Sequence, residues 1–92
     1  MTEQHSLSEA IQRIQTMETC FVTLQTAIKE NPTSVWEDSV LTHLLQRLTH
    51  YYESGQWLQD YELDEKGLLP PSLKRGVLSQ DAVYDLLEQI SS

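Results

Sequence analysis

Side chains capable of chemistry are few in this sequence, and none lies in a recognisable catalytic motif. Ser79, in the segment GVLSQD, is the nearest to a nucleophile, but the segment lacks the G-x-S-x-G turn of hydrolases. A serine directly before an apolar helix usually caps that helix instead. Cys20 flanks an apolar stripe without a neighbouring histidine or basic residue to stabilise a thiolate, so we expect a packed, inert thiol. An enzyme is therefore the less favoured class, and we assign no catalytic residue.

The possible metal ligands are also incomplete. His43 and His50 lie seven residues apart, and Glu53 is the one further ligand near them. A structural zinc site needs four ligands, so two exposed histidines are the favoured interpretation. The acidic segment 60–65 (DYELDE) resembles part of a calcium loop but has no glycine at the sixth position and no glutamate at the twelfth. The sequence also contains no glycine-rich phosphate loop, so we expect neither a metal nor a cofactor.

The charge of the chain limits its partners. The 92 residues include 14 acidic and 6 basic side chains, which gives a net charge of −8. Sequence-independent binding to nucleic acid or to an anionic membrane needs clustered lysine and arginine, and Lys74 and Arg75 are the only adjacent basic pair. We therefore expect no nucleic acid and no membrane as a partner. An acidic surface can attract a basic protein, although a solvated helix face is the simpler interpretation.

Length and composition predict one small domain in a reducing compartment. We expect 1–92 to form a single helical domain in which residues 1–5 are disordered. A single cysteine permits no internal disulfide. The polar start MTEQHSLSEA is unlike a signal peptide, and no apolar run approaches the ~18 residues of a membrane-spanning helix. These features favour a cytoplasmic protein.

Apolar periodicity predicts a first helix near residues 7–30. Ser6 and Glu9 have the spacing of a capping box at its start, and Asn31-Pro32 ends it because proline disfavours helical geometry in the preceding residue. Seven apolar side chains recur at spacings of three and four, as on one face of a helix: Leu7, Ala10, Ile14, Met17, Phe21, Leu24 and Ile28. The helix should bury this one face.

A second helix is predicted near residues 35–53. Ser34 and Glu37 repeat the capping-box spacing, and a connection of about three residues makes this helix antiparallel to the first, as a hairpin. Its apolar stripe consists of Leu41, Leu44, Leu48 and Tyr51, widened by Trp36, Val40, Leu45 and Tyr52. A hairpin cannot bury so wide a stripe alone, so the rest of the chain must cover it.

The covering segments follow in the remaining sequence. Ser54-Gly55 should break the second helix and start a short third one near 55–66, which Gly67 ends in a left-handed cap. The segment LLPPSLKRG has no regular period and is predicted to be an ordered loop that turns after Pro71, with its leucines (Leu68, Leu69 and Leu73) held against the core. Ser79 then caps a last helix near 80–90, whose buried face is Val83, Leu86, Leu87 and Ile90. The predicted fold is an all-α bundle: a two-helix hairpin covered by a short helix, a Pro/Gly loop and a C-terminal helix.

Two residues of the short third helix are the most specific features of the sequence. We expect Trp57 to close the open end of the hairpin against Tyr51 or Leu48, and Asp60 to accept backbone N–H groups of the turn at 74–77. The alternative is that Trp57 and Asp60 are exposed and bind a ligand or partner. The candidate interaction surface then comprises Trp57, Asp60, Tyr61, Asp64, Lys74 and Arg75.

The chain resembles a family of short bacterial proteins of unknown function. The resemblance rests on the pattern Y-Y-x-S-x-x-W-x-x-D, then L-P, G-V-L-S-x-D and Y-D-L-L, over roughly residues 51–87. The matching residues are Tyr51, Tyr52, Ser54, Trp57, Asp60, Leu69, Pro70, Gly76, Val77, Leu78, Ser79, Asp81, Tyr84, Asp85, Leu86 and Leu87. Met17 and Glu18 fit the I-x-x-M-E of the family's first helix. The resemblance implies a last helix that continues beyond Ser92, so whether the last helix is as long here stays open. The resemblance implies no activity, cofactor or catalytic residue.

The favoured function is a small acidic protein–protein interaction or adaptor module that contacts itself or a partner with basic residues. One alternative is a small enzyme or ligand-binding protein with its site around Trp57 and Asp60. A third possibility is an acidic inhibitor that mimics nucleic acid.

Overall fold

All regular structure that the computed structural model describes, over residues 2–91, is helical. The elements are α1 (Thr2–Glu30), α2 (Ser34–Glu37), α3 (Ser39–Glu53), α4 (Gln56–Glu65), the 3-10 helix η1 (Gly76–Leu78) and α5 (Gln80–Ser91). The predicted all-α bundle is therefore confirmed.

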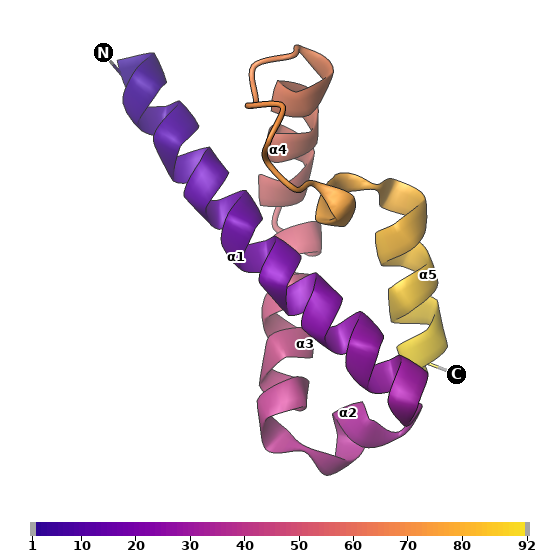
Figure 1. The fold of residues 1–92 in the computed structure, drawn as a ribbon. Helices are drawn as coiled ribbons and strands as arrows, with labels where there is room; N and C mark the ends of the chain where they lie inside the picture. Colours follow the sequence, from indigo (N-terminus) through magenta and orange to yellow (C-terminus); the bar gives the residue numbers. More distant parts are fainter. Residues whose placement is uncertain (1, 92) are drawn as a thin grey trace.

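Helix α1 runs diagonally across the molecule (Figure 1). Helices α3 and α4 follow one another in a column that crosses α1 in this view, and α5 is joined to α4 by a loop that returns to the middle of the molecule at η1. Contacts of α1 with α3, η1 and α5 place the core along its buried face. None of the described helices is both long and apolar enough to cross a membrane.

The apolar stripe of α1 is buried as predicted. Six of its seven members, from Ala10 to Ile28, lie in the core, and Leu7 is half-buried at the edge. Cys20 is also buried beside the stripe. The helix begins at Thr2, earlier than the predicted start near residue 7, and so continues through residues expected to be disordered; Met1 lies outside the described residues. Ser6 and Glu9, the expected capping box, therefore lie within the helix.

The predicted second helix is divided into α2 and α3 at Asp38. This residue has extended backbone angles (φ −114°, ψ 117°), and its carboxylate accepts a hydrogen bond of 2.8 Å from the Val40 N–H, so it caps α3. The break changes the helical register, which corrects one prediction. Val35 is buried, whereas Trp36 and Val40, expected to widen the buried stripe, are 61% and 65% exposed.

The central segment folds around two glycines with positive φ. Gly55 (φ 92°) precedes α4, and Gly67 (φ 71°) follows it as the predicted left-handed cap. The N–H of Gly67 donates to the carbonyl of Asp64, and that of Leu68 donates to the carbonyl of Leu63. Both bonds satisfy carbonyl groups at the end of α4 that have no partner within the helix.

The loop after α4 is ordered by leucines and by a turn. Leu69 and Leu73 are buried, but Leu68 is about half exposed, so the expectation that all three leucines reach the core is wrong for Leu68, which sits in the cap of α4. A bond from the Leu73 N–H to the Pro70 carbonyl closes the predicted turn at Pro71. The Ser79 hydroxyl oxygen then accepts from the Ala82 N–H at the start of α5, as predicted.

Candidate functional site

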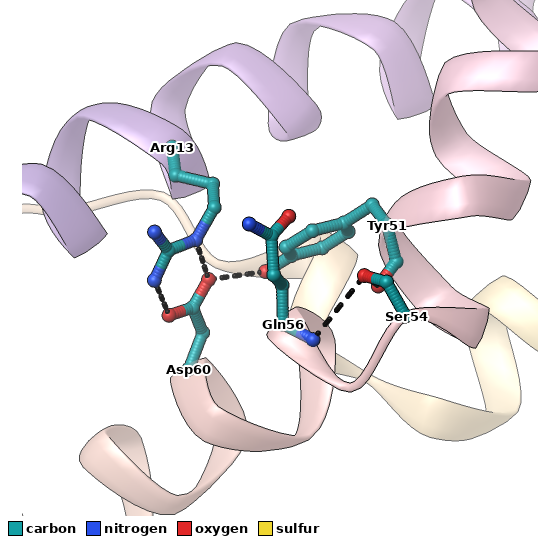
Figure 2. Close-up of polar contacts among 5 residues, drawn as sticks. All are labelled: Arg13, Tyr51, Ser54, Gln56 and Asp60. Atoms are coloured by element: carbon teal, nitrogen blue, oxygen red, sulfur yellow. Dashed lines mark hydrogen bonds and ion pairs between the residues drawn. The ribbon is translucent and has the colours of Figure 1, made fainter.

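The carboxylate of Asp60 lies at the centre of the polar contacts inside the molecule. Its side chain is fully buried (0% exposed), so it does not belong to a solvated acidic helix face. Arg13 of α1 donates to it twice, from Nε at 2.9 Å and from Nη2 at 2.6 Å. The hydroxyl of Tyr51, from α3, donates to it at 2.7 Å. Figure 2 shows this cluster joining three helices at one carboxylate.

The charge state of the cluster follows from its geometry. The hydrogen bond to Asp60 raises the pKa of Arg13, against an opposing effect of burial, so the guanidinium stays charged. Burial and then the bond to Asp60 raise the pKa of Tyr51. Tyr51 is therefore a neutral donor, and Arg13 supplies the positive charge that compensates the buried carboxylate.

The predicted partner of Asp60 was wrong, because another acidic residue binds the turn at 74–77. The N–H of Val77 donates at 2.7 Å to Oε1 of Glu18, which reaches across from α1. Gly76 permits this approach, since a Cβ built there would lie 3.2 Å from the Glu18 carboxylate. Glu18 follows Met17 in the I-x-x-M-E pattern, which was the sequence signal for it. No sequence signal identified Arg13, which stands on the polar face of α1, 47 residues before Asp60.

Trp57 binds the backbone of the same residue, Val77, at its carbonyl group. Its side chain is 6% exposed, and its Nε1–H donates at 2.8 Å to the carbonyl of Val77. The indole contacts Tyr52 with ring centroids 5.2 Å apart and stacks on Tyr61 at 5.1 Å. These ring contacts differ from the predicted ones with Tyr51 or Leu48, which belong to the same core. Trp57 and Glu18 together fix Val77, whose side chain is buried.

The remaining residues of the predicted interaction surface lie nearer to solvent. Arg75 forms an ion pair with Asp64 and donates to the carbonyl of Pro70, so it ties the loop to α4. Tyr61 is half-buried, and a hydrogen bond to Glu65 raises its pKa. Lys74 is exposed at the surface of the loop. That all six candidate residues form one interaction surface stays a prediction, with Trp57 and Asp60 inside the molecule.

The cysteine, serine and histidines considered as reactive groups or metal ligands do not form a site. Cys20 is buried, Ser79 caps α5, and His43 and His50 are exposed on α3. The part of the chain that the structure describes contains no cluster of three or more side chains able to hold a metal ion. The described surface has several hollows, including one of about 880 Å³ between α1 and α5 and one of about 400 Å³ beside Arg13 and Tyr51.

Comparison with known proteins agrees with the resemblance seen in the sequence. A family model described as a domain of unknown function (DUF4298) matches residues 4–92. Searches of curated proteins and of solved structures gave no significant match. The family model extends over α1 and α3 as well as the central segment that carries the sequence pattern, so that the residues around Asp60 lie within the matched region. The chain belongs to the DUF4298 family of domains of unknown function.

Proposed function

We propose that the protein is a small protein–protein interaction module, and that it binds a partner through the corner between α2 and α3. The observation that carries this proposal is the exposure of Trp36, at 61%, with Val40, at 65%, four residues further on. Tryptophan is the residue type that most often dominates binding energy at protein interfaces, because it buries a large rigid surface. An exposed tryptophan, with an exposed valine four residues further along the chain, supplies apolar surface for such an interface.

The charges around this corner indicate the kind of partner. Glu37 and Asp38 follow Trp36 directly, and Glu30 ends α1 nearby in the chain. The chain as a whole carries a net charge of −8, which favours encounter with a positively charged surface. In a symmetric dimer the same acidic corner meets its own copy, and the like charges repel. We therefore favour a different protein whose apolar pocket for Trp36 is rimmed by lysine or arginine.

The alternatives from the sequence have less support. A ligand site centred on Trp57 and Asp60 requires these side chains to be reachable, and both are buried in contacts with other helices. A nucleic-acid mimic requires a regular array of exposed acids, and Asp60 and Asp64 are each paired with an arginine. Both remain weaker candidates than the interaction module.

Affinity capture with matched variants tests the proposal. Wild-type protein, Trp36→Ser and Leu58→Ser are each used as bait in lysate of the source cell, and captured proteins are identified by mass spectrometry. Leu58 is also about half exposed but lies on α4, far from α2 in Figure 1, so Leu58→Ser is the control for a generally less apolar surface.

We expect one protein to bind the wild type and Leu58→Ser but not Trp36→Ser. With that protein purified, Trp36→Ser should weaken binding about 30-fold or more, as for a hot-spot residue, and added salt should weaken binding of the wild type. Equal capture by all three baits, or no specific capture in repeated experiments, contradicts the proposal. Sedimentation of the wild type and Trp36→Ser measures self-association independently.

A further inference from the structure

A pocket beside the Asp60 cluster gathers an unusual share of the protein's positive charge. It has a volume of about 400 Å³ and lies between α1, the end of α3 and the start of α4. Arg13, Arg47 and His50 line it, which are two of the three arginines and one of the three histidines in the chain. Glu9 is the one acidic side chain in the lining. In a chain with 14 acidic and 6 basic residues, a lining with two arginines and one glutamate is more basic than the chain as a whole.

Arg13 lines this space with its guanidinium fixed in orientation. Its Nε and Nη2 atoms are bound to Asp60, which fixes the guanidinium plane. Figure 2 shows the remaining terminal nitrogen turned away from the carboxylate, and the side chain as a whole is 26% exposed. A guanidinium fixed at one edge loses little entropy when its other edge binds an oxyanion, because it is already oriented.

Arg47 has no internal function that competes with ligand binding. It is exposed on α3, and among the side chains that the structure describes it has no hydrogen-bond or ion-pair partner. Its positive charge is therefore available to a ligand in the pocket that it lines.

Uncharged groups complete the lining in a way that suits a small polar molecule. Gln12 and Gln56 supply amide donors, and Met17 and Tyr51 supply apolar contact. The hydroxyl of Thr16 already donates to the carbonyl of Gln12. Figure 2 shows the Gln56 side chain rising from the start of α4 between Arg13 and Tyr51. The positive end of the α4 backbone dipole lies at the same edge of the pocket, since α4 begins at Gln56.

The charges in and around the pocket determine how strongly it attracts an anion. The carboxylate of Asp60 compensates the positive charge of Arg13, and Glu9 adds a negative charge that also interacts with Arg13. Arg47 offsets the charge of Glu9, so the formal charges of Glu9, Arg13, Arg47 and Asp60 sum to zero, and the pocket offers oriented donors and not a positive excess. Because the net charge of the whole molecule is −8 and fields are screened within ~8 Å at physiological salt, an anion must be recognised by direct contact with these side chains.

We propose that this pocket is a binding site for a small oxyanion-bearing molecule, with Arg47 and the outer edge of the Arg13 guanidinium as its charged donors. Phosphoryl and carboxylate groups share the chemistry that such a site recognises. The site is separate from the exposed corner at Trp36, so this inference does not depend on the proposed protein partner.

Nuclear magnetic resonance titration of the intact chain tests the proposal. Inorganic phosphate and acetate are titrated separately into ¹⁵N-labelled protein at ~0.15 M ionic strength, balanced with sodium chloride. We expect saturable shifts of the backbone signals of Gln12, Arg47 and Gln56 with at least one anion. The anion that saturates at the lower concentration assigns the ligand as phosphoryl or carboxylate.

Two charge-matched variants make the result specific. Arg47→Gln should raise the dissociation constant about tenfold without changing the melting temperature, because Arg47 is exposed. Lys74→Gln removes an exposed charge that does not line this pocket and should leave the dissociation constant unchanged. Absence of saturable shifts with both anions overturns the proposal. Equal affinity of Arg47→Gln and the wild type, or equal weakening in both variants, overturns it as well.

Discussion

Asp60 shows how a single buried charge can determine the packing of three helices. Its three hydrogen bonds come from two other helices, and no part of the side chain is exposed. A buried carboxylate without partners is strongly unfavourable, so any arrangement of the helices that separates Asp60 from Arg13 is penalised. The cluster therefore favours one relative position of α1, α3 and α4 over alternatives that bury similar apolar area.

Removing the charge of Asp60 tests this role. We expect Asp60→Asn to lower the free energy of unfolding by about 2–3 kcal/mol, because the amide nitrogen cannot accept from Arg13 and the guanidinium loses its counter-charge. This loss of stability is smaller than that expected for a fully buried ion pair, because Arg13 is partly exposed. Asp64→Asn, at the half-buried pair with Arg75, is the control and should cost less than about 1 kcal/mol. Urea unfolding that gives equal values for the two variants contradicts the assignment.

Tyr51 makes stability depend on alkaline pH. Its pKa in the folded state is raised above the ordinary tyrosine value of about 10 by burial and by the bond to Asp60. Above about pH 10 Tyr51 loses its proton in the unfolded chain but keeps it in the folded protein. The unfolded state then binds fewer protons, and the free energy of unfolding falls as the pH rises. Below about pH 10 both states keep the proton and this contribution is constant.

The expected slope from Tyr51 is at most about 1.4 kcal/mol per pH unit above pH 10. Unfolding curves of the wild type and Tyr51→Phe between about pH 8 and 11 measure it. The variant should be less stable at pH 8 because it lacks the bond to Asp60, yet lose less stability on further increase of pH. An identical alkaline slope in both proteins means that Tyr51 ionises as readily in the folded as in the unfolded state, contrary to our expectation.

At the scale of elements, α1 organises the fold because its side chains reach every other part of the core. Arg13 binds α4, and Glu18 binds the peptide N–H of Val77 in η1. Trp57 of α4 binds the carbonyl of the same residue, so the irregular loop is held between two helices. The two glycines that bound α4 let the chain turn there without side-chain strain.

The two tryptophans provide a matched comparison of a buried and an exposed ring. Trp57→Ala should cost about 3–5 kcal/mol, from the lost packing and from a Val77 carbonyl left without its donor. Trp57→Phe retains a ring but not the N–H and should cost less. Trp36→Ala, at the exposed corner, should change stability by no more than about 0.5 kcal/mol. Thermal melts in which Trp57→Ala is as stable as Trp36→Ala reject this structural role for Trp57.

The whole molecule carries more negative charge than its ion pairs compensate. Fourteen acids repel one another across a chain whose described part is about 44 × 23 × 22 Å, and they are partly screened by salt. We expect sodium chloride, raised from about 0.01 to 0.3 M, to stabilise the protein on the order of 1 kcal/mol, or roughly 4–8 °C in melting temperature. Calorimetry at a series of salt concentrations measures this. A melting temperature that falls with salt shows that the ion pairs of Arg13 and Arg75 outweigh the repulsion.

Local features of the fold could be predicted from the sequence, because their causes lie within one or two helical turns. The spacing of apolar residues from Ala10 to Ile28 determined which face of α1 is buried. Gly67 and Ser79 determined where α4 ends and α5 begins, since a left-handed cap and a hydroxyl cap each act on neighbouring backbone groups. At Asp38 two local signals competed: the apolar spacing favoured one continuous helix, whereas Asp38 caps a new helix, α3. The prediction followed the apolar spacing and therefore missed the break and the exposure of Trp36.

Tertiary structure alone decided which polar groups meet. Asp60 and Arg13 are 47 residues apart, and Val77 and Glu18 are 59 apart, so no local spacing relates them. The sequence indicated that Asp60 and the turn at 74–77 each needed a partner, because buried polar groups must be satisfied. It did not indicate the partner, since several charged side chains on α1 are equivalent until the helices are docked. The pocket of Arg13, Arg47 and His50 arises in the same way, from three elements that only the packed fold brings together.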